Sequence, residues 1–262
     1  MHRTIEPSDP DPSATASFRP KLRLFADLPL DAGTVLEPSP GQSHYLLTVM
    51  RLGEGDPVAL FNGEDGEWLG VIEGVQRRRC RVAVSELLRP QQPEPGPTLL
   101  FAPLKRSRLE LLVEKATELG VGSLQPVICR RSVVDRVNRS RLESVMIEAA
   151  EQCGRLTLPE LGWPLGLDDC LANRPAGERL YFGDETGGGL PILDALERFG
   201  PGDLLIGPEG GFAPDELADL QAQPDTVALS LGARILRAET AAIAGLACWQ
   251  AAFGSGADQV VA

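Results

Sequence analysis

The sequence predicts an α/β protein in two parts, a small β-barrel followed by a larger domain with a parallel sheet. Three observations predict it. Residues 22–88 contain short apolar runs with period-2 alternation, which is typical of strands. Residues 89–97 include four prolines and one glycine, a composition that favours neither helix nor sheet and is typical of a linker. From residue 98 onward strand-like and helix-like segments alternate, which indicates α/β organisation.

The first part begins after a stretch rich in Ser, Pro, Asp and Thr. We interpret residues 1–17 as a disordered tail, because such a composition offers little apolar surface to bury. Residues 18–88 then form the predicted barrel, with a turn at Asn62–Gly66. Its predicted strands are Leu22–Phe25, Val58–Phe61, Trp68–Ile72 and Arg81–Leu87.

The second part, residues 98–262, is predicted to alternate between strands and helices. The predicted strands are Thr98–Ala102, Leu124–Cys129, Leu180–Phe182, Asp203–Ile206 and Thr226–Ser230. The predicted helices are Ser107–Leu119, Ser140–Cys153, Pro191–Phe199, one that begins near Pro214, and Ala238–Phe253.

The first two helices of this part carry signals for their ends. Each begins with a pattern typical of a capping box, in which a serine and a glutamate three residues later satisfy backbone N–H groups. The two pairs are Ser107 with Glu110 and Ser140 with Glu143. Gly120 and Gly154 follow the two helices and favour their ends, because glycine readily adopts the left-handed conformation that closes a helix.

The net charge of -12 argues against a protein that binds nucleic acid, because phosphate binding depends on Lys and Arg. The distribution of the charge weakens this objection. Residues 162–262 contain 15 acidic and 5 basic side chains, whereas residues 102–155 contain 10 basic and 7 acidic ones. The basic residues are therefore concentrated in one central block.

The 5 cysteines are scattered without a CxxC pair, and the chain has only 2 histidines. No pattern typical of a zinc site results, so we expect no metal. The N-terminus lacks the basic start and apolar stretch of a secretory signal. The most apolar segment, residues 241–253, is too short to span a bilayer. We therefore expect a cytoplasmic protein without a membrane partner.

The segment Gly207–Phe212 follows a predicted strand and precedes a predicted helix. It contains three glycines, which permit a ligand to approach the backbone closely. In α/β sheets, ligands commonly bind outside the carboxyl ends of strands, where such loops lead into helices. The alternative interpretation is a tight turn without a ligand, because glycine clusters are common in loops.

The segment Leu231–Thr240 also follows a predicted strand and combines apolar with charged residues. Leu231, Ile235 and Leu236 are unusual in a surface loop, and they could sandwich a flat ring such as adenine. Ordinary core packing is the alternative for any one of them. The chain lacks a GxxxxGK[ST] motif and a complete GxGxxG motif after a strand, which argues against ATPases and dehydrogenases that use these motifs.

These two segments, together with Glu114–Val121 and Glu148–Pro159, resemble the signatures of the SPOUT-class methyltransferases that modify N3 of uridine in ribosomal RNA. Met50–Gly55 and Val58–Gly63 resemble the N-terminal PUA-like barrel of the same family. The likeness covers most of the chain, and its segments follow the order of the family. The resemblance implies a C-terminal SPOUT domain with a parallel sheet and a deep trefoil knot, preceded by an RNA-binding PUA-like barrel.

The resemblance further implies the cofactor S-adenosyl-L-methionine and a homodimer. The implied substrate is a uridine of 16S rRNA, in the small ribosomal subunit or its precursor. Two alternatives remain open, another SPOUT activity on tRNA or a different rRNA nucleotide, and a noncatalytic RNA-binding role in ribosome assembly. The residues expected to bind the cofactor are Phe182, Gly183, Ile206, Gly207, Gly210, Gly211, Leu231, Gly232, Ile235, Leu236 and Thr240.

Methylation of N3 requires removal of its proton, because the neutral atom is a poor nucleophile, and alignment with the methyl group. Arg155 and Arg237 are the candidates for stabilising the negative charge that develops on the uracil oxygens. Each could instead form an ion pair within the fold. Glu209 is the candidate for helping to remove the N3 proton, and the alternative is that it orders the glycine loop by accepting backbone hydrogen bonds.

Basic residues outside the two loops are candidates for contacts with RNA. Most of them lie just after predicted strands or at the start of a helix, where contacts with phosphate are plausible. Solvated surface charge is the alternative interpretation. The expected RNA-binding residues are Arg51, Lys105, Arg106, Arg108, Arg130 and Arg131.

Overall fold

The computed structural model describes residues 20 and 22–254. The chain divides into two compact units, of which the first ends at Gln91 and the second begins at Gln92. This division falls within the proline-rich residues 89–97. The tail expected at residues 1–17 lies outside the described residues.

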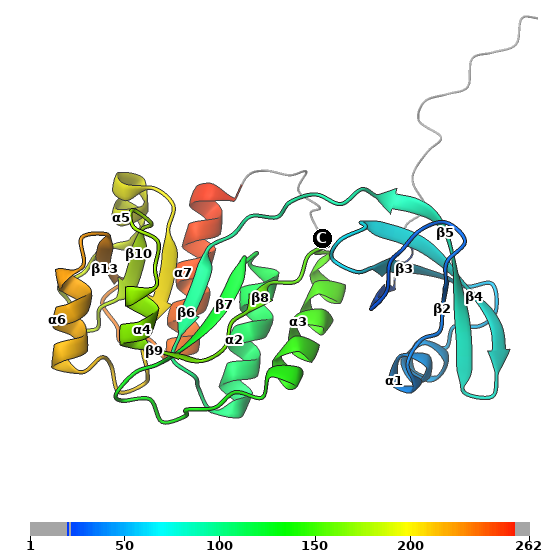
Figure 1. Ribbon diagram of the computed structural model, residues 1–262, viewed down its shortest axis with the longest axis horizontal. Helices are drawn as coiled ribbons and strands as arrows, with labels where there is room; N and C mark the ends of the chain where they lie inside the picture. Colours follow the sequence, from blue (N-terminus) through cyan, green and yellow to red (C-terminus); the bar gives the residue numbers. More distant parts are fainter. Residues whose placement is uncertain (1–19, 21, 255–262) are drawn as a thin grey trace, which may run out of the picture. The chain divides into compact units, whose positions relative to one another are not determined.

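The first unit is built on a five-stranded sheet with the order β1-β3-β4-β5-β2 (Figure 1). β1 pairs with β3 in parallel, and the other pairs are antiparallel. A short helix, α1, continues directly into a π-helical turn, η1. The elements are β1 (Arg23–Phe25), β2 (Val35–Leu36), α1 (Pro40–His44), η1 (Tyr45–Val49), β3 (Pro57–Phe61), β4 (Glu67–Gln76) and β5 (Arg79–Arg89).

All four strands predicted for the first part are present, each within a few residues of its expected bounds. Their alternation buries one set of side chains in a common core, including Val58 and Leu60 of β3 and Ile72 of β4. β2 and α1 were not predicted. α1 begins at a capping box formed by Ser39 and Gln42, but the helix is too short to show a period in the sequence.

The second unit contains an eight-stranded sheet with the order β11-β13-β10-β12-β6-β7-β8, and β9 pairs with β7 beside this path. Every strand pair recorded in it is parallel. The strands are β6 (Thr98–Phe101), β7 (Ser123–Ile128), β8 (Glu160–Leu161), β9 (Leu165–Gly166), β10 (Leu180–Gly183), β11 (Leu190–Pro191), β12 (Asp203–Ile206) and β13 (Thr226–Ser230).

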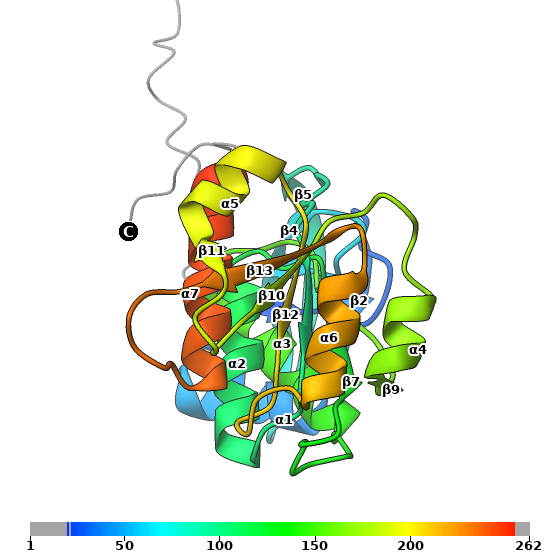
Figure 2. The same ribbon diagram turned by 90° about the vertical axis from the view of Figure 1, so that its left-hand side faces the viewer.

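Helices cover both faces of this sheet, as the end-on view in Figure 2 shows. Because side chains alternate along a strand, Leu99 and Phe101 pack on one face and Leu100 on the other. The first face carries α2, α3, α5 and α7, and the second carries α4 and α6. The helices are α2 (Arg106–Glu118), α3 (Arg139–Cys153), α4 (Leu167–Ala172), α5 (Ile192–Phe199), α6 (Pro214–Ala222) and α7 (Ala238–Phe253).

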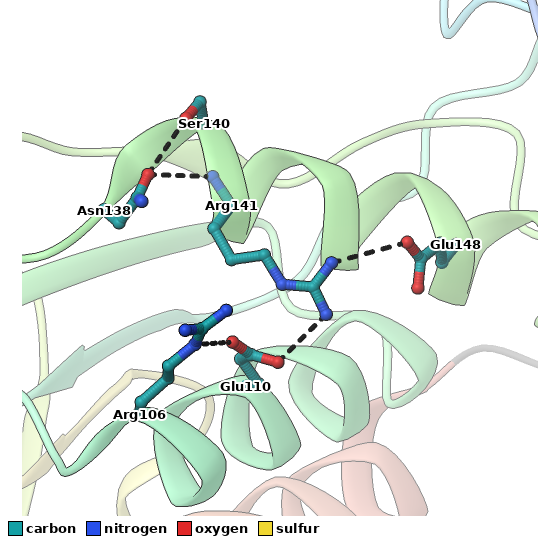
Figure 3. A network of polar contacts seen from close by, with 6 residues as sticks. All are labelled: Arg106, Glu110, Asn138, Ser140, Arg141 and Glu148. Carbon is teal, nitrogen blue, oxygen red and sulfur yellow. Dashed lines mark hydrogen bonds and ion pairs between the residues drawn. The ribbon is translucent and has the colours of Figure 1, made fainter. Parts of the chain in front are cut away.

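The predicted caps of α2 and α3 are wrong at their N-termini. α2 begins after Lys105, which makes no side-chain capping bond. At α3, Oδ1 of Asn138 accepts a hydrogen bond from the backbone N–H of Arg141 at 3.1 Å, so Asn138 caps the helix in place of Ser140 (Figure 3). The C-terminal glycine of α3 is confirmed, since Gly154 has a φ of 83°.

Among the helices of the described residues, none combines the length and the apolar character that crossing a bilayer needs. Within the same residues, no three His, Cys, Asp or Glu side chains gather in a way that could hold a metal ion.

Candidate functional site

Three loops meet at the carboxyl edge of the parallel sheet. They follow β12, β10 and β13, which are neighbours in the sheet although the chain visits them in a different order. Together with the first turns of α2 and α7, the loops line a cavity of about 790 Å³. Its position and size are typical of a small-molecule site in an α/β protein.

The loop after β12 needs glycine at two places. A Cβ at Gly207 would lie 2.9 Å from the ring of Phe212, and one at Gly211 would lie 1.8 Å from Oε1 of Glu185. Gly211 also has a φ of 68°, which other residues adopt only at a cost. Gly210 meets neither restriction, since a Cβ there would make only an ordinary contact with Arg131.

The loop after β13 supplies the apolar wall. Leu231 and Leu236 line the cavity, and so does Ile235, which is 83% exposed. An aliphatic side chain at a cavity rim offers a surface for a flat ring. Gly232 has a φ of 111°, which lets the chain turn back toward α7. The loop ends at Arg237, the N-cap residue of α7, which also lines the cavity.

The loop after β10 supplies an acidic wall that was not predicted from the sequence. Asp184 and Glu185 both line the cavity, whereas only the preceding residues Phe182 and Gly183 had been expected to bind the cofactor. Asp184 is 8% exposed, and its Oδ1 accepts hydrogen bonds from the backbone N–H and the hydroxyl of Thr186 at 2.8 and 2.7 Å. The rule that ligands bind at carboxyl ends of strands could have identified both acids, because they directly follow a predicted strand.

Arg108 of α2 reaches into the same cavity. Its guanidinium donates a hydrogen bond to the carboxylate of Glu209, and its Nε lies 3.7 Å from Oε1 of Glu239. Glu239 is buried in the first turn of α7. Arg108 thus joins the glycine loop, α2 and α7 at one edge of the cavity, and its predicted contact with RNA stays a prediction.

Most of the residues expected to bind a cofactor come together around this cavity. Phe182 is buried beneath it with its ring centroid 6.3 Å from that of Phe212, while Gly210 and Thr240 do not line it. Glu209 and Arg237, two of the three residues expected to act in catalysis, line it. The cavity is also lined by Gly183, Ile206, Gly207, Gly211, Leu231, Gly232, Ile235 and Leu236.

Arg155, the third expected catalytic residue, does not line this cavity within one chain. It is 7% exposed, donates hydrogen bonds to the carbonyl of Thr117 and the hydroxyl of Thr157 at 3.0 Å each, and lies 3.7 Å from a carboxylate oxygen of Glu94. Burial lowers the pKa of Arg155 below its ordinary value, and the carboxylate of Glu94 opposes this shift.

The other expected RNA-binding residues are exposed. Arg130 pairs with Asp215, and Arg131 donates a hydrogen bond to the carbonyl of Gly210 at 2.9 Å, so both lie beside the glycine loop. Three further residues lie elsewhere: Arg106 pairs with Glu110 on α2 (Figure 3), Lys105 precedes that helix, and Arg51 is in the first unit with a φ of 58°.

Comparison with family models matches both units. Residues 92–250 match the model of an RNA methyltransferase domain, and residues 39–85 match that of an RNA methyltransferase PUA domain. A protein of Rickettsia conorii named ribosomal RNA small subunit methyltransferase E is 37% identical over 206 residues, which cover 78% of this chain and 84% of that protein. The chain therefore belongs to the RNA methyltransferase family that includes the small subunit methyltransferases E.

Solved structures agree with this assignment. A methyltransferase from Legionella pneumophila, solved with the bound cofactor SAM, aligns with a TM-score of 0.78 and 30% identity over 90% of this chain and 98% of its own. A ribosomal RNA small subunit methyltransferase E from Neisseria gonorrhoeae, bound to S-adenosyl methionine, aligns with a TM-score of 0.74 and 26% identity over 88% and 97%. The predicted class, a parallel α/β domain preceded by a PUA-like domain, is confirmed, and the trefoil knot stays a prediction.

Proposed function

We propose that this protein transfers a methyl group from S-adenosyl-L-methionine to N3 of a uridine in 16S rRNA of the small ribosomal subunit. The observation that carries the proposal is the cavity built by three loops at the carboxyl edge of the sheet. The names of the relatives and the cofactor in two related structures support the substrate and the cofactor.

The residues of the cavity fit this cofactor. Its volume of about 790 Å³ is within the range of sites for ligands of this size. Leu231, Ile235 and Leu236 offer an apolar surface for the adenine ring, and Gly207 and Gly211 leave the backbone accessible where side chains would clash. When bound, the cofactor supplies the methyl group as a cation carried on a sulfonium.

Arg237 and Glu209 are the residues that we propose to act on the base. Both line the cavity, so the guanidinium of Arg237 can stabilise negative charge on the uracil oxygens. Glu209 can accept the N3 proton, and the hydrogen bond from Arg108 holds its carboxylate at the rim. The contacts of Arg155 instead support a role in holding the C-terminal ends of α2 and α3.

We propose that RNA contacts the first unit and the basic residues beside the glycine loop. The match of residues 39–85 to a PUA domain of RNA methyltransferases supports the first part of this surface. Arg130 and Arg131 support the second, because they lie next to the loop where the base would react. A substrate in the ribosome supports a cytoplasmic location for this activity.

We also propose that the protein is a homodimer that uses α7. Ala247, Ala251 and Ala252 are exposed on this helix, and small apolar side chains favour close packing against a second copy. Sedimentation equilibrium on the full chain tests this proposal, and a monomer at micromolar concentration would contradict it.

The cofactor and the reaction can be tested in sequence. Calorimetric titration with S-adenosyl-L-methionine should give one site, whereas a noncatalytic RNA-binding protein would give no heat of binding. Small subunits from cells that lack this protein should then gain 3-methyluridine in 16S rRNA on incubation with protein and cofactor. A different methylated nucleoside, or methylation of tRNA alone, would overturn the proposed substrate.

The role of Arg237 has its own test. Arg237→Ala should lower the single-turnover rate at saturating cofactor by about a hundredfold, as loss of one charge-stabilising group does in other enzymes. Arg198→Ala, on the exposed face of α5, is the matched control and should keep the wild-type rate. An unchanged rate for Arg237→Ala would remove it from the reaction.

A further inference from the structure

Charged residues of both signs line the cavity, and most of them are not paired with one another. Arg108 and Glu209 pair with each other, but four further charged residues do not take part in any ion pair within the described part of the chain. Arg234 and Arg237 lie on the wall after β13, while Asp184 and Glu185 lie on the wall after β10.

The acidic wall holds a carboxylate whose hydrogen bonding is incomplete. Oδ1 of Asp184 accepts two hydrogen bonds from Thr186, but Oδ2 is buried and has no hydrogen-bond partner among the described residues. Buried polar atoms are nearly always satisfied, and a buried carboxylate without a compensating charge is costly. A positive charge beside Asp184 would reduce this cost.

Glu185 extends the wall into the open part of the cavity. Its side chain is exposed, and its carboxylate lies over Gly211, where even one methyl group would collide with it. The position of this carboxylate therefore depends on a glycine in the neighbouring loop. The two adjacent acids, one buried and one accessible, make this end of the cavity acidic.

We propose that Asp184 and Glu185 bind the α-ammonium group of the cofactor's amino-acid part. This inference rests on the proposed cofactor site and adds the residues that orient the amino-acid end within it. Glu185 contacts the ammonium directly, and the buried charge of Asp184 strengthens the attraction from behind. A cation fits better than the ribose hydroxyls, because neutral donors would leave two carboxylates close together without a compensating charge.

The test compares ligands with and without the ammonium group. S-adenosyl-L-homocysteine carries it, and 5′-methylthioadenosine keeps the adenine, the ribose and a sulfur atom but lacks the whole amino-acid part. Glu185→Gln and Asp184→Asn should each lower the affinity for S-adenosyl-L-homocysteine about tenfold or more in calorimetric titrations, as loss of a hydrogen bond to a charged group does. Both variants should bind 5′-methylthioadenosine as the wild type does, which also shows that the cavity is folded.

Asp194→Asn is the matched control, because it removes one negative charge from an exposed position on α5 outside the cavity. It should leave the affinity for both ligands unchanged. Equal weakening of both ligands by Glu185→Gln would mean that the acid binds the nucleoside part and would overturn the inference, as would an unchanged affinity for S-adenosyl-L-homocysteine. A wild-type protein that binds neither ligand would instead contradict the proposed function.

Discussion

At the scale of single residues, the site depends on how closely its loops approach one another. The loop after β12 and the loop after β10 come together at Gly211, where the backbone has a positive φ and the carboxylate of Glu185 takes the place of a side chain. One hydrogen atom in place of a methyl group therefore allows two separate segments of the chain to share one wall of the cavity.

Gly211→Ala should weaken binding of S-adenosyl-L-methionine by about tenfold or more. An alanine at this position costs about 1 kcal/mol of conformational free energy, because the backbone is left-handed there, and its methyl group displaces the carboxylate of Glu185. Gly210→Ala is the neighbouring control, since its Cβ would make only an ordinary contact and its φ is not positive. Calorimetry on both variants measures the difference. Equal affinities of the Gly211→Ala and Gly210→Ala variants would show that the close approach of Glu185 to Gly211 does not matter for binding.

Arg108 has a partner that its own neighbourhood in the sequence does not reveal. Its place at the start of a helix led to the prediction of a contact with RNA, which stays a prediction. The structure adds a partner within the chain, Glu209, from a loop that lies 101 residues later. A pair at this separation leaves no local pattern, so only the folded chain could identify it.

At the scale of elements, helix bodies were easier to predict than helix starts. The apolar period fixes which residues of α3 face the core, and these are Leu142, Val145, Met146, Ala149 and Ala150. The first turn has no such constraint. Asn138 takes the capping position because the helix begins at Arg139, one residue before the serine that fits the capping-box pattern.

Asn138→Ala should therefore lower the free energy of unfolding by about 1 kcal/mol through the loss of this cap. Ser140→Ala should have a smaller effect, because the Ser140 hydroxyl donates only an exposed hydrogen bond to Asn138 (Figure 3). Urea unfolding followed by circular dichroism compares the two variants. A larger loss of stability in Ser140→Ala than in Asn138→Ala would indicate that Ser140 caps the helix.

The polar contacts between α2 and α3 form a network on one surface of the second unit. Glu110 of α2 accepts a hydrogen bond from Arg141 of α3 at 2.9 Å and another from Arg106 at 3.0 Å (Figure 3). These hydrogen bonds lower the pKa of Glu110 from 4.5 to about 2. The carboxylate therefore stays ionised at every pH at which the enzyme would meet RNA, and the two helices remain linked.

At the scale of the whole molecule, each unit has its own core and its own stabilising contacts. The first unit is held by Glu67, whose nearly buried carboxylate accepts hydrogen bonds from Nε of Arg23 at 2.6 Å and Nε of Arg89 at 2.7 Å. Burial raises the pKa of Glu67, but the hydrogen bonds and charges of the two arginines outweigh it, so that the pKa lies below 4.5. These contacts join β1, β4 and β5.

Glu67→Ala should destabilise the first unit by about 3 kcal/mol, because it removes the anion from a largely buried cluster of charges. Hydrogen exchange with mass spectrometry should show faster exchange in β3, β4 and β5, with β6 and β12 unchanged. In the wild type, the lowered pKa gives stability that is complete above pH 4.5 and is lost as the pH falls through the folded-state pKa. The variant should lose this acid dependence, and an equal acid dependence in both proteins would contradict the role of Glu67.

The order and type of most elements, and two of the three loops of the site, could be predicted from the amino-acid sequence. Apolar period and glycine content are local properties, so they can be read without knowing the fold. Only the folded chain reveals that β10 lies between β12 and β13, although it precedes both in the chain. This placement brings Asp184 and Glu185 into the cavity, whereas Arg155 lies outside the cavity of its own chain. The neighbours of a strand in a parallel sheet depend on long-range packing, so no local sequence pattern could predict this arrangement.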